Sequence, residues 1–368
     1  MTTTIADDVI MAGVKADAIY VGRVIRNITA PNAAPFAGIL PFCLVPYLSL
    51  FVYESRAKLI ANDPAMQTAL SQDADAICAR SRHSLKLFED TQRGIEGQLD
   101  YFRDEILVAH SERFLNNTWF PPARVLETDL GIYSYAGRPI ATTHAATFHM
   151  GIEPRALLEA DAPYIQGLFA QYGSYFGKLG ARLDAGADTF VVHLDSAQLD
   201  AKNDKRASKY YGRVFNGPTT PAINGLLVGF QAMMNFADSI ISVGANIHDL
   251  EYTVFKIRYL TVYEVLMSLQ LLRNDPAYPM SSASMDSIRT IVDTPEAQLI
   301  TTRPTKAFRN TLMHYNLNHH VDLSRVDLGQ PLFGLVPVYF PTHDLHTFSE
   351  LVDRCIRETA AGLNTWAA

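Results

Sequence analysis

The chain has 368 residues, 48% hydrophobic and 19% charged, with a formal net charge of −7. This length and apolar content predict about two globular domains with buried cores, while the acidic balance argues against a general nucleic-acid coat, which needs a basic face. Cys43, Cys78 and Cys355 stand far apart without metal-ligand spacing. They predict buried thiols in a reducing, cytoplasmic compartment, and argue against a disulfide framework or structural zinc.

The first segment of interest covers residues 27–53, which carry no charge. This is long enough for the roughly 20 residues of a membrane helix. Four prolines interrupt the segment and only its last third is densely apolar, which favours a buried entry segment and helix. A membrane helix or re-entrant loop is the alternative. The N-terminus, MTTTIADDVIMAG, is acidic where a signal peptide is basic, so secretion is not expected.

Helical periodicity dominates the rest of the chain. From Asp73 to Asn116, apolar residues recur at spacings of three and four, without proline and with two glycines, Gly94 and Gly97. This pattern predicts one long helix or two in line. Further helices are predicted at 58–71, 156–181, 221–245, 247–273, 283–295, 305–317 and 345–363. The run at 248–275 is apolar nearly all round, as expected at the centre of a bundle.

Strand-like pieces are short and cover 126–134, 189–194 and 332–339, where they are expected to form connecting hairpins or edges. The Gly-Arg-Pro run at 137–139 and a change of texture through 149–154 indicate a boundary near residue 150. The predicted fold is therefore mainly α, with an N-terminal helical domain at 1–150 and a C-terminal helical domain at 151–368. Each is a helical bundle, with a few short β-hairpin insertions.

The segment KNDKRASKYYGR at 202–213 concentrates positive charge in an acidic chain. Five lysines and arginines stand against one aspartate, with two tyrosines between them. A solvated loop or helix face explains such a run. The alternative is a phosphate-contacting, base-stacking surface for RNA. Its residues would be Lys202, Lys205, Arg206, Lys209, Tyr210 and Arg213.

The stretch KAFRNTLMHYNLNHH at 306–320 contains the most specific pattern. On a helix Asn310 and His314 share a face, and the long Arg309 side chain can reach around to them. Arginine grips phosphate oxygens with a planar fork, and histidine exchanges protons near neutral pH. The three residues predict a phosphate site, although an ordinary polar helix face is the alternative.

A second, looser copy lies in the first half of the chain. In YFRDEILVAHSE, Asp104 follows Arg103, and His110 comes seven positions after the arginine. Seven positions are close to two helical turns, which places Arg103 and His110 on one face about 10 Å apart along the axis. Asp104 and Glu105 beside Arg103 also fit a solvated salt-bridge face. Arg138 and His144, with five residues between them, form a similar pair, but Pro139 follows the arginine and the segment reads as a loop.

An arginine followed by Asn or Asp, then a histidine four to six residues further on a helix with an aromatic after it, resembles the signature of HEPN domains. The match is close at 309–315 and looser at 103–110. The resemblance implies four- or five-helix bundles and a composite active site built from two facing motifs. It implies metal-independent RNA cleavage, through 2′-hydroxyl attack, to a 2′,3′-cyclic phosphate and a 5′-hydroxyl, without a cofactor. The implied catalytic residues are Arg309, Asn310, His314, Arg103 and His110.

The resemblance also implies a setting in defence, abortive infection or toxin–antitoxin systems. RNA is then the substrate, with a homodimer or two paired halves of one chain, and an inhibitor or antitoxin protein as a further partner. From the texture of residues 27–53, membrane contact is not expected. The alternative function is a non-catalytic helical scaffold that binds RNA, a nucleotide or another protein. A metal site at His314, His319, His320 and Asp322 lacks further ligands at suitable spacing. Neither phosphate-loop motifs nor a GxSxG elbow occurs.

Overall fold

The computed structural model describes residues 4–61, 63–85, 94–152, 161–181, 188–200, 202–216, 220–243, 251–278, 280–317 and 322–368. Within these ranges the protein is mainly helical, with a small three-stranded antiparallel sheet. This confirms the predicted fold class.

Helices and 3-10 or π turns fill most of the described part of the chain up to residue 152. They are α1 (Ile5–Ile28), η1 (Pro31–Ala33), α2 (Leu40–Leu59), η2 (Pro64–Thr68), α3 (Gln72–Leu85), α4 (Gly94–Tyr101), the π-helical η3 (Phe102–Val108), α5 (Ala109–Phe114), η4 (Pro121–Leu126) and α6 (Thr143–Met150). Strands β1 (Leu130–Tyr135) and β2 (Arg138–Thr142) precede α6.

The later elements include three long helices of the core. They are α8 (Asp161–Phe176), the π-helical η5 (Gly177–Ala181), η6 (Phe190–His193), η7 (Ser196–Gln198), β3 (Asn203–Lys205), α9 (Ala207–Tyr211), η8 (Val214–Asn216), α10 (Pro221–Ser239), α11 (Tyr252–Asn274), α12 (Ser282–Val292), α13 (Pro295–Ile300), α14 (Arg303–His314), η9 (Leu323–Arg325), η10 (Pro331–Gly334), α15 (Leu335–Tyr339) and α16 (Leu345–Ala367).

Local sequence signals set several helix starts. Thr4 and Asp7 form a reciprocal capping box at α1, which satisfies donors that a helix start otherwise leaves exposed. Thr220 caps α10 ahead of Pro221, and the Asp344 side chain caps α16. Proline at the first helical position costs little because its missing N–H has no intrahelical partner there.

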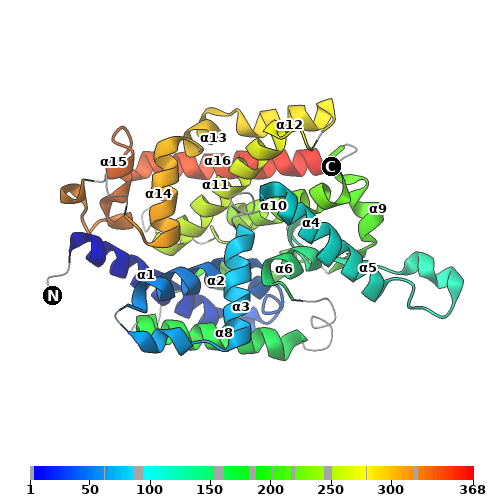
Figure 1. Ribbon diagram of the computed structural model, residues 1–368, viewed down its shortest axis with the longest axis horizontal. Coiled ribbons are helices and arrows are strands. Elements are labelled where there is room, and N and C mark those ends of the chain that lie inside the picture. The colour runs from blue at the N-terminus through cyan, green and yellow to red at the C-terminus, as the bar shows by residue number, and fades with distance from the viewer. Residues whose placement is uncertain are drawn as a thin grey trace.

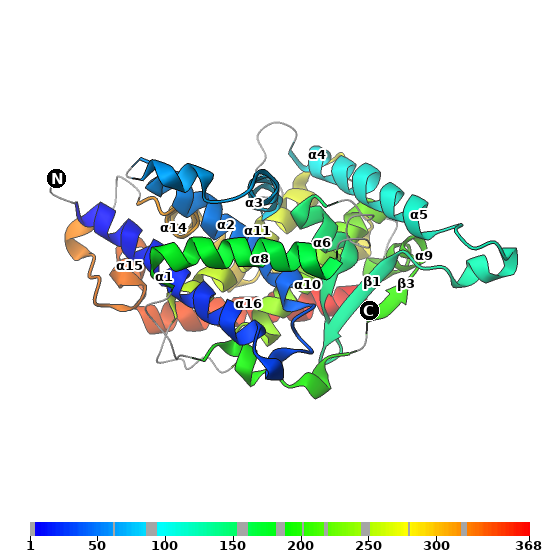
Figure 2. The same cartoon turned by 90° about the horizontal axis from the view of Figure 1, so that it is seen from below.

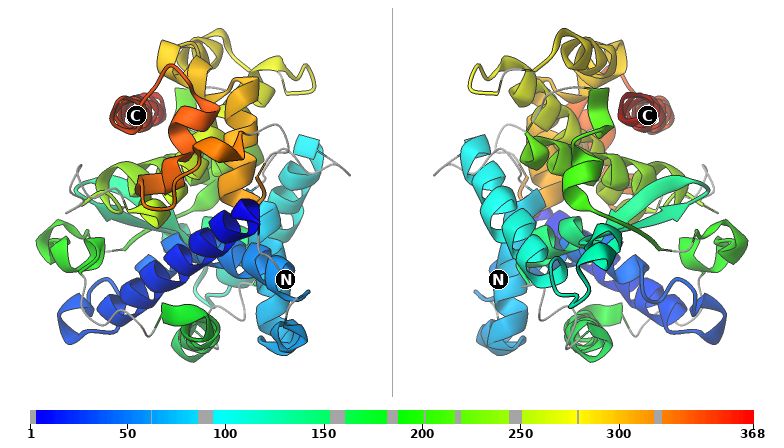
Figure 3. Two further views of the ribbon diagram at one scale, coloured as in Figure 1. Left: turned by 90° about the vertical axis from the view of Figure 1, so that its left-hand side faces the viewer. Right: turned by 90° about the vertical axis from the view of Figure 1, so that its right-hand side faces the viewer.

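Two clusters of buried side chains form the core. In Figures 1 and 3, α12 and α16 lie on one side of the molecule and α8 on the opposite side. One cluster gathers around α10, α11 and α16 and includes Phe102 and Ile106. The other gathers around α1, α2 and α8 and includes Phe236 and Leu260. Both clusters take side chains from both sides of residue 150, so the two predicted halves share both cores.

The uncharged segment at 27–53 contains a buried helix, as the favoured prediction stated. Its later part belongs to α2, in which 15 of 20 residues are buried against other helices. Within the described part of the chain, none of the helices combines the length and apolar character that crossing a bilayer requires.

The sheet has the order β2-β1-β3 (Figure 2). Leu130 pairs with Lys205, so the first part of the basic segment is joined to the β1–β2 hairpin. The strand prediction near 126–134 is confirmed by β1, but those at 189–194 and 332–339 are wrong. These residues form η6, and η10 with α15. Strand preference reflects how a side chain fits a particular packed surface, and at these two places helical packing outweighs it.

Candidate functional site

Arg309 points into the core of the protein. Its side chain is 1% exposed, and its Nε lies 2.8 Å from Glu264 Oε1 on α11. Its Nη2 pairs with the same carboxylate, and its Nη1 donates to Asn310 Oδ1 at 2.8 Å. The ion pair therefore fastens α14 to α11. In this arrangement the guanidinium does not face solvent, where a phosphate would bind.

His314 lies at the other side of the same helix. Five positions along an α-helix correspond to a rotation of roughly 140°, so Arg309 and His314 follow different faces. His314 Nδ1 is 3.0 Å from Glu54 Oε1, and that oxygen also accepts from Arg82 Nε at 2.8 Å. The side chains of His314 and Arg82 are 21% and 20% exposed. The expected pairing of Arg309 with His314 is therefore not formed. His314 instead belongs to a cluster with Glu54 and Arg82.

The charge of Glu54 is stabilised by this cluster. Burial acts to raise its pKa, but the hydrogen bonds and charges of His314 and Arg82 outweigh burial and hold the pKa below its ordinary value. Glu54 is therefore a carboxylate near neutral pH. A carboxylate at Nδ1 fixes the orientation of an imidazole and favours its protonated form.

Arg103 and His110 do not share a face. Arg103 is at the surface, 58% exposed, and pairs with Asp100 at 2.9 Å and Asp104 at 2.8 Å, whereas His110 is 1% exposed. The intervening residues form a π-helix, which takes more residues per turn than an α-helix. Seven positions therefore fall short of two turns, and the predicted alignment of these two side chains is wrong.

The two predicted motifs also lie far apart. In Figures 1 and 2, α14 is at one end of the molecule and α5 is near the other. The structure does not bring Arg309 and His314 together with Arg103 and His110, and a composite site within one chain is not formed. A pair of facing motifs would need a second copy of the chain.

The basic segment is partly structural. Lys205 and Arg206 are half-buried, Lys209 and Arg213 are exposed, and Lys202 pairs with Asp204 at 3.0 Å. Tyr210 is half-buried, and Tyr211 is 1% exposed within the core. Lys202 and Asp204 also line a groove that the sequence analysis did not identify.

This groove has a volume of about 1070 Å³ and mostly apolar walls. It is formed by the end of α1, the start of α2, and parts of α5, β1, α6, α8 and β3. Ile28, Phe42, Phe114, Leu130 and Phe169 supply apolar surface. Its size is at the upper end of the range for small-molecule sites, which are typically apolar with a few placed polar groups.

His110 supplies one of those polar groups. Its Nε2 is 3.1 Å from Thr147 Oγ1, and that hydroxyl donates its only hydrogen to the carbonyl of Thr143 at 3.0 Å. With the hydroxyl engaged in this way, Nε2 carries the proton and Nδ1 is an acceptor. Among the residues that the structure describes, this buried Nδ1 makes no hydrogen bond of ordinary geometry, although the Asp129 backbone lies close enough to His110 to raise its pKa slightly against the effect of burial. Burial lowers the pKa of His110 to about 4, so the ring is neutral near pH 7.

Neighbouring rings hold His110 in place. Phe114 stacks on it with ring centroids 5.5 Å apart, and the centroid of His144 is 4.3 Å away. His144 is fixed in turn by Tyr211 OH at 3.0 Å and by the Asp129 carbonyl at 2.8 Å. Burial lowers the pKa of His144 well below its ordinary value. The pair is therefore neutral and rigid, and His144, which the sequence analysis discarded, positions His110.

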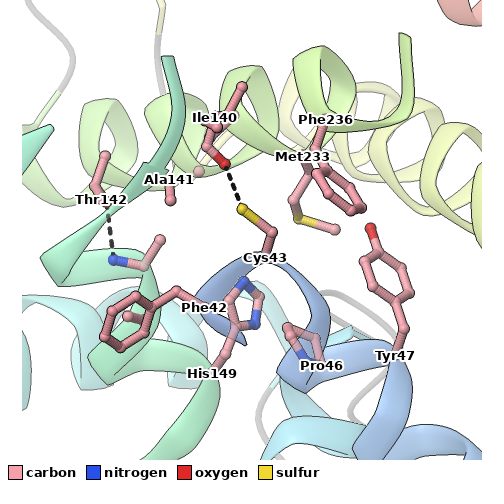
Figure 4. A pocket seen from close by; sticks show the side chains of 14 residues that line it. Phe42, Cys43, Pro46, Tyr47, Ile140, Ala141, Thr142, His149, Met233 and Phe236 are labelled. Atoms are coloured by element: carbon pink, nitrogen blue, oxygen red, sulfur yellow. Dashed lines mark hydrogen bonds between the residues drawn. The ribbon is translucent and has the colours of Figure 1, made fainter. Parts of the chain in front are cut away.

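A smaller cavity of about 30 Å³ adjoins the groove (Figure 4), and Phe42, Thr142 and Ala146 line both. Cys43 Sγ points to the carbonyl of Ile140 at 3.5 Å, and burial raises the pKa of this thiol to about 12. The space is enough for about one water molecule, and the thiol is not poised to react. All three cysteines are free and buried, as predicted.

The groove was not predicted from the sequence because its lining residues come from distant segments and no local pattern encodes it.

The described His, Cys, Asp and Glu side chains form no group of three that could hold a metal ion, and His319 and His320 lie outside the described residues. Comparisons of the chain with protein-family models, with curated proteins and with solved structures found no match.

Proposed function

We propose that the protein binds an amphipathic small molecule in the groove beside His110. The observation that carries this proposal is the buried, neutral Nδ1 acceptor without a partner in a mostly apolar groove. A buried polar atom left without a hydrogen bond costs about 1–3 kcal/mol. The atom is shielded from solvent in the free protein, so a ligand would reach it by displacing neighbouring side chains such as Phe114, and a hydrogen bond donated to it would recover that cost.

The chemistry of the groove defines the ligand. Its apolar walls accept an aliphatic or aromatic body, and Nδ1 requires a hydroxyl or similar donor. Lys202 and Asp204 form an exposed ion pair among the lining residues, where a polar end group can remain in contact with water. The proposed ligand class is therefore a long-chain alcohol or a related lipid with a free hydroxyl group.

A matched pair of ligands tests this function. Dodecanol and dodecyl methyl ether share an apolar chain, but only the alcohol can donate to Nδ1. We expect the native protein to bind the alcohol about fivefold more tightly, corresponding to about one net hydrogen bond. His110→Phe keeps an aromatic ring and should lose that preference. Affinity is measured by displacement of the fluorescent apolar probe anilinonaphthalene sulfonate.

A steric variant provides the control for this experiment. Ala170 lines the groove from an exposed position on α8, so Ala170→Trp can fill the groove with little disturbance of the core. It should abolish binding of both ligands while circular dichroism stays unchanged. Equal affinity of the native protein for alcohol and ether, or undiminished binding by Ala170→Trp, contradicts the proposal.

The His314–Glu54–Arg82 cluster supports a second candidate function, metal-independent RNA cleavage. The observation that favours it is the 3.0 Å contact from His314 Nδ1 to the Glu54 carboxylate at a partly exposed position. In cleavage, the 2′-oxygen loses its proton and attacks the phosphorus. The bond to the 5′-oxygen breaks, and that oxygen takes a proton. His314 would exchange one of these protons, and Arg82 would offset phosphate charge.

Cleavage needs one group to take the proton from the 2′-oxygen and another to give a proton to the 5′-oxygen at the same time. His314 can do only one of these, so a facing copy of the cluster from a second chain in a C2 dimer would supply the other group. The Arg309/Asn310 pair then has a supporting role, since it holds α14 against α11. RNA specificity, an inhibitor protein and a defence role remain proposals attached to this candidate.

The ribonuclease candidate is tested with RNA and DNA pools in EDTA. We expect RNA alone to be cut, to ends with a 2′,3′-cyclic phosphate, and His314→Gln to reduce the rate at least about a hundredfold. The matched control is His346→Gln, because His346 forms a comparable contact to Glu350 at 3.3 Å on the exposed surface of α16. Cleavage retained in His314→Gln, or lost equally in His346→Gln, contradicts a catalytic role for His314.

A further inference from the structure

Residues 115–127 form an arm that projects from the body of the protein beyond α5, at the far right of Figures 1 and 2. Several large apolar side chains of the arm are exposed. Trp119 is 91% exposed, Phe120 51%, Val125 67% and Leu126 81%. Exposed large apolar residues are otherwise scattered singly over the described surface, at Ile5, Met11, Val108 and Leu328. Such clustering marks an interaction surface.

The arm is held in shape at its base. The Glu127 carboxylate accepts hydrogen bonds from the backbone N–H groups of Asn116, at 2.5 Å, and Thr118, at 2.9 Å. These bonds hold the pKa of Glu127 below its ordinary value. The two ends of the arm are therefore joined by hydrogen bonds, and the exposed apolar side chains lie on a closed loop.

The arm begins and ends at the groove. Phe114 precedes it and Thr128 follows it, and both residues line the groove. Phe114 also stacks on His110. An object that the arm contacts is therefore brought next to the place where the proposed ligand binds.

Charge on the arm selects the kind of surface that it contacts. Between Leu115 and Leu126 the only charged residue is Arg124. Glu112 and Arg113 lie just before Phe114, and Glu127 follows the stretch, where its carboxylate accepts the backbone hydrogen bonds at the base of the arm. Both arginines are exposed. Aromatic and aliphatic side chains flanked by cationic ones are the combination that partitions into the boundary between phosphate headgroups and acyl chains.

We propose that this arm inserts its apolar tip into the surface of a phospholipid bilayer, and that the groove takes up its amphipathic ligand from there. The uptake rests on the proposed function, whereas insertion of the arm can be tested by itself. Membrane contact was not expected from the sequence, which drew attention only to residues 27–53. The contact proposed is peripheral and uses a different segment.

The protein contains its own reporter for this contact. Of its two tryptophans, Trp119 lies in the arm and is 91% exposed, whereas Trp366 is 2% exposed, with Nε1 bonded to the Phe215 carbonyl at 2.9 Å. Phosphatidylcholine vesicles should shift the emission of the native protein to shorter wavelength, and brominated phosphatidylcholine should quench it. Trp119→Phe should remove both changes, because Trp366 is shielded.

Sedimentation with the same vesicles measures the strength of binding. The double variant Trp119→Ser/Phe120→Ser should lower the partition coefficient about a hundredfold, and both positions are exposed, so folding should be retained. Leu328→Ser, at another exposed apolar residue, is the matched control and should bind as the native protein does. Added phosphatidylglycerol should strengthen binding through Arg124, the charged residue within the exposed part of the arm.

Each remaining outcome decides between explanations. Unchanged Trp119 emission with vesicles, or unimpaired sedimentation of the double variant, overturns the proposal. A shift in emission that grows with protein concentration without vesicles identifies a second copy as the occupant, and also overturns it. The double variant should still bind dodecanol in solution. If the native protein binds vesicles but does not bind dodecanol, the proposed function of the groove is wrong and the proposed insertion of the arm stands.

Discussion

Replacing Arg309 with methionine is expected to lower the free energy of unfolding by about 3–5 kcal/mol. The guanidinium is 1% exposed and pairs with Glu264, whose side chain is 5% exposed. Methionine fills much of the same volume but leaves the carboxylate buried without its charge partner. Removal of one member of a buried pair costs far more than the pair contributes as a whole. Urea unfolding followed by circular dichroism measures the loss.

The double variant Arg309→Met/Glu264→Leu should regain most of that stability, because no buried charge remains. Arg103→Met is the matched control at an exposed ion pair and should leave the unfolding midpoint almost unchanged. A native-like midpoint for Arg309→Met would show that Arg309 is not engaged inside the core. If the large loss is found, reduced RNA cleavage in an Arg309 variant cannot by itself identify a catalytic arginine.

Asp17→Asn is expected to cause a similar loss, about 3–5 kcal/mol near pH 7. Lys256 is fully buried, and its Nζ lies 2.6 Å from Asp17 Oδ2. Thr253 and Tyr315 also donate to this carboxylate, at 2.7 and 2.5 Å. The amide keeps the shape of the side chain but removes the charge, so the Lys256 ammonium remains in the core without its main partner.

The loss should depend on pH with a defined sign. Burial already lowers the pKa of Lys256 below 10.5, and the charge of Asp17 is the largest effect opposing this. In Asp17→Asn the folded-state pKa falls further, while the unfolded chain keeps its proton up to about pH 10.5. The unfolded state then binds more protons, so stability rises as pH increases through that window.

Chemical denaturation of both proteins at about pH 7 and about pH 9.5 measures this difference. The deficit of Asp17→Asn relative to the native protein should be smaller at the higher pH. A constant deficit would mean that Lys256 keeps its proton throughout. In that case the loss would arise from altered hydrogen bonds to Tyr315 and Thr253.

Residue spacing predicted the helix at the candidate site but not the partners of its side chains. The helix around Arg309 and His314 was predicted nearly correctly, at 305–317 against Arg303–His314 in the structure. The partners were not predictable, because Glu54, Arg82 and Glu264 come from α2, α3 and α11. The same reasoning failed for Arg103 and His110, since it assumed an α-helix where the backbone forms a π-helix.

The sequence by itself determined the helical class, the approximate positions of most helices and the buried state of the cysteines. These properties depend on apolar periodicity and local capping, which nearby residues encode. Only the tertiary structure decided that Arg309 faces Glu264, that His110 is buried beside a groove, and that Trp119 is exposed on a projecting arm. Each of these depends on contacts between segments distant in the chain, whose side-chain burial and charge pairing no local pattern specifies.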